Sequence, residues 1–296
     1  MELDIKEIQR NVHRIKFTLK GFGIEYAQTL CIMSDLHWDN PYCNRQLLKK
    51  HLDHCLEKKI PVAIIGDLFC VMQGKYDPRS SKDDIREEHQ RGDYLDAVVR
   101  TAVEWFKPYK DILFLITPGN HESSILKRME TDLIDRLVQG LKQEGAKHIH
   151  KGGYSGWIAV QINYANSNHS AVKKIWYHHG YGGGAPVTKG TIQTARQQNY
   201  VRNADILVNG HIHNSWFFPI EGIELSQKMK VRHVRTMHVR TPGYKEEYDD
   251  GYGGWHIERG GAPKPNGSAL FDFHLDRKRR DKVENTQCEI EYRELR

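Results

Sequence analysis

Short apolar runs alternate with amphipathic segments through the first half of the chain, and this alternation limits the possible folds more than any other feature. The apolar runs are Leu30–Ser34, Val62–Gly66 and Ile112–Thr117, each as long as a buried strand. The segments between them, Arg45–Lys58 and Asp93–Phe106, carry apolar residues at helical spacing. Strands that alternate with helices are typical of a largely parallel, helix-covered sheet, so the sequence predicts an α/β fold.

A further helix is predicted over Ser123–Val138, and beyond it strand-like runs separated by glycine-rich turns dominate. These runs are Tyr154–Gln161, Lys173–Tyr177, Ile206–Asn209, Trp216–Ile220, Lys230–Arg240 and Ala269–Leu275. We expect the sheet to continue there or to pair with a second sheet. No linker divides the chain, so we expect one domain over residues 1–296, with insertions near 74–90 and 243–267.

Side chains that bind metals follow five of the apolar runs. They are Asp35 and His37, then Asp67, Asn120, His179, and finally His211 and His213. Ligands of open α/β sheets bind outside the carboxyl ends of the strands, so we expect these side chains to converge. Carboxylate, imidazole and amide donors without a thiolate suit manganese, iron, zinc or nickel.

The spacing of these residues also favours metal binding. Asp35 and His37 are two residues apart, so in extended chain both side chains leave the same face, and His211 and His213 repeat this spacing. A carboxylate such as Asp67 can bridge two cations about 3.5–4 Å apart, the separation in dinuclear hydrolytic sites. Asn120 adds a neutral oxygen, which limits the negative charge that an approaching phosphate meets.

These motifs resemble those of the calcineurin-like metallophosphoesterase superfamily. Its Asp-x-His, Gly-Asp, Gly-Asn-His, His-Gly and Gly-His-x-His motifs occur in the family order between Ile32 and His213. The resemblance implies a β-sandwich flanked by helices, with four layers in the order αββα. It also implies two divalent ions, manganese first among the candidates. One ion would be held by Asp35, His37, Asp67 and His213, and the other by Asp67, Asn120, His179 and His211.

The same resemblance implies a mechanism in which a hydroxide that bridges the two ions attacks phosphorus in line. His121 matches the family histidine that contacts the phosphate and protonates the leaving oxygen. Two positions depart from the family pattern: Cys70 replaces an acidic or amide residue, and Glu122 stands where aspartate is common. Either histidine of His178-His179 could be the ligand, and we prefer the second because a glycine follows it.

The charge pattern bears on the substrate. The net charge is +6, and Leu225–Lys245 contains six basic residues and no acid. Lys228, Lys230 and Arg232 would make one strand face basic, and a second basic run follows at Arg277–Arg280. We expect a nucleic-acid phosphodiesterase, similar to the phage-encoded and repair-exonuclease members of the superfamily. Three alternatives remain: an enzyme for small nucleotides or phosphomonoesters, a solvated basic edge without a ligand, and a non-catalytic scaffold.

The cellular compartment is predicted from cysteine usage and from the hydropathy of the chain. Five scattered cysteines without a C-x-x-C pair indicate reduced thiols rather than a disulfide framework. No apolar run approaches the roughly 18 residues of a membrane span, and the first residues do not resemble a secretion signal. We therefore expect a cytoplasmic protein, in the host cytoplasm if a phage encodes it, without a membrane partner. The sequence leaves the oligomeric state open.

Overall fold

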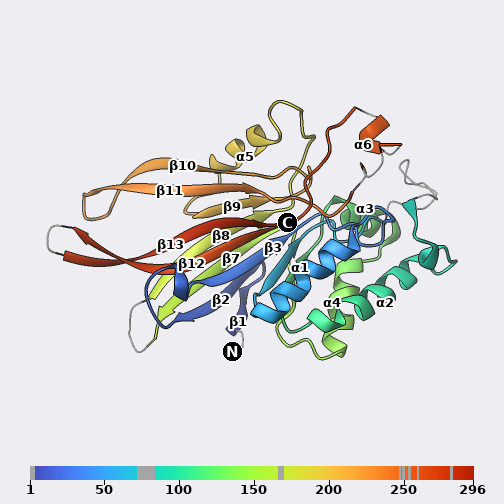
Figure 1. The fold of residues 1–296 in the computed structure, drawn as a ribbon, viewed down its shortest axis with the longest axis horizontal. Helices are drawn as coiled ribbons and strands as arrows, with labels where there is room; N and C mark the ends of the chain where they lie inside the picture. The colour runs from blue at the N-terminus through green and yellow to red at the C-terminus, as the bar shows by residue number, and fades with distance from the viewer. Residues whose placement is uncertain are drawn as a thin grey trace.

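Two sheets stack face to face in the computed structural model, with helices on the outside (Figure 1). The structure describes residues 4–71, 84–165, 170–246, 248, 251–252, 255–258, 260–280 and 283–296. The six-stranded sheet has the order β13-β12-β3-β4-β5-β6, and the seven-stranded sheet has the order β1-β2-β7-β8-β9-β11-β10. The predicted β-sandwich flanked by helices is confirmed, and the second half of the chain supplies most of the second sheet.

The six-stranded sheet is built around three parallel strands from the first half of the chain. Its strands are β3 (Gln28–Met33), β4 (Val62–Ile65), β5 (Leu113–Thr117), β6 (His150–Lys151), β12 (Ser268–Arg280) and β13 (Val283–Leu295). β3, β4 and β5 are parallel neighbours, and β12 joins β3 in the antiparallel sense. The carboxyl ends of β3, β4 and β5 therefore lie at one edge of the sandwich.

The seven-stranded sheet contains two strands that the sequence analysis did not predict. Its strands are β1 (Asp4–Gln9), β2 (Val12–Leu19), β7 (Ser155–Tyr164), β8 (Ser170–His178), β9 (Ile206–Asn209), β10 (Trp216–Leu225) and β11 (Val231–Arg240). β1 and β2 form the added hairpin at one side. β9 is parallel to both β8 and β11, so these three strands also end at a common edge.

An apolar core fills the space between the sheets. Side chains from both inner faces contribute to it, among them Ile15, Phe17, Ile32, Ile65, Val160, Ile175, Val208 and Phe271. In β2 the buried residues alternate with more exposed ones, as expected for a strand with one face on a core. This period-two pattern at His13, Ile15, Phe17 and Leu19 is the signal that could have predicted β2.

Helices α1 (Arg45–Lys58), α2 (Tyr94–Phe106) and α4 (Leu133–Gln143) pack on the outer face of the six-stranded sheet. Both helices predicted between the first three strands are confirmed. The N-terminus of α1 is capped by Asn44, whose side chain accepts a hydrogen bond from the Leu47 amide at 2.9 Å. The buried side of α1 includes Leu48, Leu52 and Cys55.

The prediction of one helix over Ser123–Val138 is wrong. Two helices, α3 (Asn120–Met129) and α4, replace it, and Glu130 between them has left-handed backbone with φ of 53°. Asp132 then caps α4 by accepting a hydrogen bond from the Asp135 amide. The apolar spacing continues across the break, so periodicity alone could not reveal it.

The outer layer of the seven-stranded sheet is thin. It contains the short helix α5 (Thr191–Gln198), and a small cluster of Trp176, Val201, Ala204 and Leu207 packs next to it. The other short elements are η1 (Ile24–Tyr26), η3 (Glu87–His89), η4 (Lys107–Tyr109) and α6 (Trp255–Glu258). The predicted insertions fall partly outside the described residues: the first at 74–83, and the second at 247, 249–250, 253–254 and 259.

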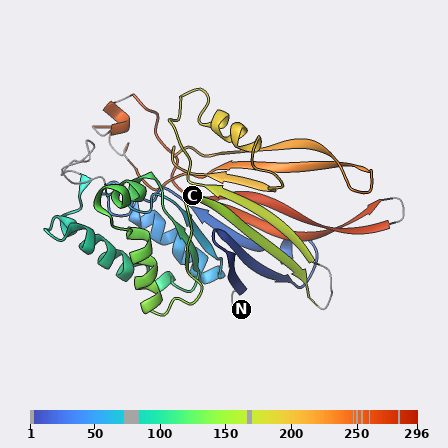
Figure 2. The same ribbon diagram turned by 180° about the vertical axis from the view of Figure 1, so that it is seen from behind.

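Two hairpins, β10–β11 and β12–β13, project together from the end of the sandwich opposite the helices (Figures 1 and 2). The basic strand predicted over Lys230–Arg240 begins one residue later, so Lys228 and Lys230 lie in the turn. All five cysteines are free thiols and are buried. Among the described helices, none has the length and apolarity needed to cross a membrane.

Candidate metal centre

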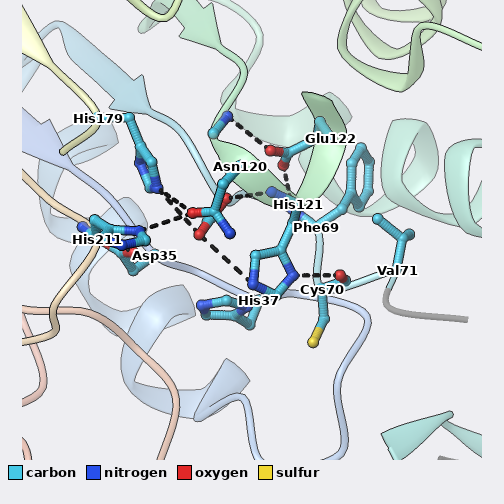
Figure 3. Close-up of polar contacts among 12 residues, drawn as sticks. Asp35, His37, Phe69, Cys70, Val71, Asn120, His121, Glu122, His179 and His211 are labelled. Atoms are coloured by element: carbon cyan, nitrogen blue, oxygen red, sulfur yellow. Dashed lines mark hydrogen bonds and ion pairs between the residues drawn. The ribbon is translucent and has the colours of Figure 1, made fainter. Parts of the chain in front are cut away.

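The structure brings all seven candidate ligands to one end of the sandwich. Figure 3 shows five of them close to His121, namely Asp35, His37, Asn120, His179 and His211. Asp35 and His37 follow β3, and Asp67 follows β4. Asn120 begins α3 directly after β5. His179 follows β8, and the loop after β9 carries His211 and His213. The convergence predicted from the strand ends is therefore observed.

The first ligand set consists of Asp35, His37 and His213, whose donor atoms lie within 4.8 Å of one another. The Nε2 atoms of His37 and His213 are 3.2 Å apart, and His213 Nε2 is 3.5 Å from Asp35 Oδ1. Donors bound at roughly 2.1 Å to one ion lie roughly 3 Å from each other. The spacing therefore fits a divalent cation, and the mixed nitrogen and oxygen donors suit manganese, iron or zinc.

The second ligand set consists of Asp67, His179 and His211, again with donor atoms within 4.8 Å of one another. His179 Nε2 lies 3.1 Å from Asp67 Oδ2 and 3.1 Å from Asn120 Oδ1. The same amide oxygen is 2.7 Å from Nδ1 of His211. The Asn120 amide oxygen thus lies beside this set, where the family resemblance places it, and its role as a ligand stays a prediction.

The two sets are tied together at Asp35 and at Asp67. Both carboxylate oxygens of Asp35 accept a hydrogen bond from the backbone amide of His211, at 3.0 and 2.8 Å. The backbone amide of His37 donates to the carbonyl of Asp67 at 3.0 Å, which holds the loops after β3 and β4 side by side. The bridging role of the Asp67 side chain stays a prediction.

Hydrogen bonds with the backbone orient the imidazoles of the adjacent residues His178 and His179. His179 donates from Nδ1 to the Ile65 carbonyl at 3.1 Å, which leaves Nε2 toward Asp67. His178 instead accepts a hydrogen bond from the Gly180 amide at 2.8 Å and packs against Trp176. Of the two adjacent histidines, the structure therefore brings the preferred one, His179, to the ligand set.

Left-handed backbone is common among the candidate ligands. Positive φ angles between 46° and 78° occur at Asp35, His37, Asp67, His211 and His213. Such angles are uncommon outside glycine and concentrate at functional sites, although aspartate and histidine tolerate them better than most residues. The chain turns sharply at the end of each strand and in this way aims these side chains inward.

Two glycines allow the loops to approach each other closely. Gly66 has φ of 90°, a conformation that side chains rarely adopt. Gly119 has ordinary backbone angles, but a Cβ atom there would overlap the carboxylate and amide of Asp67. The first glycine is therefore required by its conformation and the second by lack of space.

Burial and neighbouring charges set the protonation of the site. Burial alone would raise the pKa of Asp67, but His179 and His121 hold it well below its usual range. Burial, reinforced by His121 and His213, lowers the pKa of His37 well below its usual value. Burial opposes protonation of His179 as well, yet the Asp67 carboxylate raises the pKa of His179 to about 9. Ionised carboxylates and a neutral His37 are the forms that bind cations.

Glu122 and Asp39 hold the loop that carries Asp67. The carboxylate of Glu122 accepts hydrogen bonds from the amides of Phe69 and Gly119, both at 2.8 Å. Burial and the Asp67 charge raise the pKa of Glu122 to about 8. Asp39 accepts from the Cys70 amide at 2.5 Å. Glu122, which stands where the family commonly has aspartate, therefore positions this loop with both of its carboxyl oxygens.

The departure at Cys70 leaves the orientation of His121 intact. His121 donates from Nδ1 to the carbonyl oxygen of Cys70, a contact that any residue at this position could supply. The thiol itself accepts a hydrogen bond from the Asn40 amide at 3.3 Å, and burial raises its pKa. Cys70 also lies near the imidazoles of His37 and His121, but His37 already belongs to the first ligand set.

The sequence analysis missed residues at the ends of β3 and β11 that support the ligands. Ser34 donates to Asp35 Oδ2 at 2.5 Å and lies 2.6 Å from the hydroxyl of Thr241. Arg240, buried, donates to the carbonyl of Gly210 at 2.5 Å, one residue before His211. Arg240 ends a predicted strand and Thr241 follows it, so the strand-end rule could have found both.

The predicted substrate-binding residues lie far from this centre. Lys228, Lys230 and Arg232 are at the exposed turn end of the β10–β11 hairpin, whereas the other end of β11 reaches the ligands. At about 3.3 Å per residue, β11 separates the two by roughly 30 Å. Arg232 also forms an ion pair with Glu224 at 3.7 Å. Their role in substrate binding stays a prediction.

A comparison with known families identifies the one to which this chain belongs. The chain matches the calcineurin-like phosphoesterase family over residues 29–215, a segment that contains every candidate ligand. A solved structure of Vacuolar Protein Sorting 29 from Cryptosporidium parvum is similar at 15% identity and a TM-score of 0.37, over 92% of this chain and 100% of that one. A search of curated proteins gives no match. The chain belongs to the calcineurin-like phosphoesterase family, whose members are metal-dependent hydrolases of phosphoric esters.

Proposed function

We propose that the protein is a dinuclear metal-dependent phosphodiesterase that acts on nucleic acid. The observation that carries the proposal is the presence of two clusters of possible metal ligands side by side, with His121 next to His37 and Asp67. In the proposal Asp35, His37 and His213 hold one ion, and Asn120, His179 and His211 hold the other. Asp67 is shared between them.

The residues of this chain divide the chemical work. Two divalent ions, when bound, neutralise phosphate charge and lower the pKa of water. His121 is fixed through Nδ1, so its Nε2 is directed toward Asp67, 3.8 Å from Oδ2. From there it can contact a phosphate oxygen and give a proton to the leaving oxygen. Glu122 keeps the backbone that carries His121 and Asp67 in register.

Charge supports a polyanionic substrate. The chain carries a net charge of +6, and two hairpins with basic residues at their ends extend from the sandwich. An enzyme for small nucleotides or phosphomonoesters would need neither feature, which makes it the second candidate. A non-catalytic scaffold is disfavoured because it would not need both ligand sets. Five free, buried cysteines support work in a reducing compartment such as the cytoplasm.

A substrate panel tests the proposal. The protein is loaded with manganese and assayed on single-stranded DNA, duplex DNA, RNA, cyclic nucleotides, bis-p-nitrophenyl phosphate and p-nitrophenyl phosphate. We expect cleavage of a polynucleotide, and of the model diester in preference to the monoester. Activity confined to monoesters or cyclic nucleotides would overturn the nucleic-acid assignment. Repeating the assay with iron, zinc and nickel tests the choice of manganese.

A further inference from the structure

A pocket of about 680 Å³ opens directly beside the second ligand set. Its walls are formed by Asn120, Ser123, Ser124, Lys127, Arg128 and Tyr154. The inner wall is Asn120, whose amide oxygen also faces His179 and His211. A molecule in this pocket would therefore lie next to a phosphate at the metal centre.

One face of α3 supplies most of the pocket. The lining residues from Asn120 to Arg128 recur at intervals of three and four, which places them along a single helical stripe. The opposite side of α3 is buried and includes His121 and Ile125. The exposed stripe offers an amide, two hydroxyls and two cations. No carboxylate is among the lining residues, so the pocket favours an anion.

Tyr154 forms the wall opposite α3, and its ring is held in place. The hydroxyl donates to the carbonyl of Gly180 at 2.9 Å, and burial raises the pKa of the phenol, which keeps it protonated. The ring meets His179 edge-on, with centroids 5.4 Å apart. A fixed aromatic ring beside a phosphate site is the kind of surface on which nucleobases stack.

The size of the pocket matches more than a phosphate. Sites for small organic ligands occupy about 300–1,000 Å³, and a single nucleotide falls within this class. The aliphatic stems of Lys127 and Arg128 can line the sugar while their charged ends reach solvent. The pocket therefore offers an aromatic wall, hydroxyls and cations, the groups that suit the base, sugar and outer phosphate of a nucleotide.

We propose that this pocket binds the nucleotide adjacent to the scissile phosphodiester, with its base against Tyr154 and its outer phosphate on Lys127 and Arg128. This inference rests on the proposed function and names the part of the substrate that the site recognises. Lys127 and Arg128 lie beside the metal centre and Lys228 and Lys230 do not, so the pocket and the β10–β11 hairpin would contact different parts of a polynucleotide.

Oligonucleotide binding tests the proposal without any need for turnover. The full-length protein is titrated into a labelled single-stranded oligonucleotide in EDTA, and anisotropy is followed across a salt series. We expect Lys127→Ala combined with Arg128→Ala to weaken binding by roughly tenfold and to reduce the salt slope by about 1.4, the value for two lost phosphate contacts. The matched control, Lys58→Ala combined with Lys147→Ala, removes the same charge from two exposed lysines that precede the parallel strands β4 and β6, at the edge opposite the ligands, and should bind like the wild type.

The ring of Tyr154 is tested separately. Tyr154→Leu should weaken binding by about tenfold through lost stacking, whereas Tyr154→Phe keeps the ring and should bind as the wild type does. Circular dichroism confirms that each variant is folded. With manganese, the α3 variant should raise the KM for the oligonucleotide and leave turnover of bis-p-nitrophenyl phosphate unchanged.

Unchanged binding by the α3 variant, or an equal loss in the control variant, would overturn the pocket assignment. The first result would exclude Lys127 and Arg128 as contacts. The second would mean that diffuse positive charge holds the nucleic acid. Failure of the proposed function looks different, because the wild-type protein would then cleave no polynucleotide whatever the binding of the variants.

Discussion

Nδ1 of His121 lies 2.5 Å from the carbonyl oxygen of Cys70, and this contact fixes the imidazole without help from the side chain at position 70. Because Nδ1 must donate to the carbonyl, Nε2 is the nitrogen left for chemistry. The ring also meets His37 edge-on at 4.8 Å, so it borders the first ligand set without belonging to either set in the proposal.

Replacing His121 with alanine should reduce kcat by about 10²–10⁴-fold and leave the metal content unchanged, as expected for a general acid. The loss should be larger for an oligonucleotide than for bis-p-nitrophenyl phosphate, whose leaving group needs little protonation. Rates on the two substrates and metal analysis of the purified variant check this. His148→Ala is the matched control. Loss of metal from the His121 variant would identify it as a ligand instead.

Replacing Asp67 with alanine should abolish activity and release at least one ion. The carboxylate contacts His179 and accepts a hydrogen bond from the backbone amide of His121. Its removal should therefore disturb both the second ligand set and the proposed general acid. Metal content per chain and phosphodiesterase rate are the measurements. Asp111→Ala, a change of an exposed carboxylate, should alter neither. Near-normal turnover with two ions bound would contradict the shared role of Asp67.

Replacing Glu122 with glutamine should destabilise the protein by about 1–3 kcal/mol, the cost of leaving a buried donor unsatisfied. Both carboxylate oxygens accept backbone amides, and a glutamine offers only one acceptor oxygen. The free energy of unfolding in urea measures the effect. Glu57→Gln makes the same substitution at an exposed site and should change stability little. Equal stability of the two variants would show that the Glu122 contacts contribute nothing measurable.

His238 should make stability fall at acidic pH. It is fully buried, stacks on Phe218 and has a pKa that burial lowers from 6.5 to about 4. Between pH 6.5 and pH 4 the unfolded state binds a proton at this histidine and the folded state does not. The free energy of unfolding is therefore highest above pH 6.5 and decreases as the pH falls toward 4. Between pH 7 and 5 the loss from this group is about 2 kcal/mol.

Urea unfolding at pH 7 and pH 5 measures this loss. His238→Gln cannot titrate and should lose about 2 kcal/mol less than the wild type over this interval. His54→Gln changes a histidine on the solvent side of α1 and should follow the wild type. Parallel pH dependence of His238→Gln and the wild type would mean that His238 is not held neutral in the folded state.

Local sequence patterns predicted the convergence of the candidate ligands because each lies within a few residues of a strand end. Once the strands are parallel, their ends must meet, and Asp35, Asp67 and His211 are brought together by topology alone. α1 was predicted for a similar reason, because its amphipathic spacing lies within one continuous segment.

Other parts of the site depend on contacts between distant segments, which no local pattern records. Tyr154 reaches His179 because β7 and β8 pair, and Ser34 meets Thr241 across 207 residues of sequence. The break at Glu130 was missed since a left-handed residue interrupts the backbone without changing the apolar spacing. The basic hairpin was predicted as a charged surface, but its distance from the ligands follows only from the fold.

The left-handed ligand residues have an evolutionary consequence. Each such angle at a non-glycine residue costs roughly 1 kcal/mol or more, a strain that glycine would relieve. Aspartate and histidine occupy these turns although left-handed backbone favours glycine. Selection for a working centre must therefore keep them there. A homologue released from catalysis would gain stability by drifting to glycine at these positions, and such a drift would mark the lineages in which the enzyme has become a passive protein.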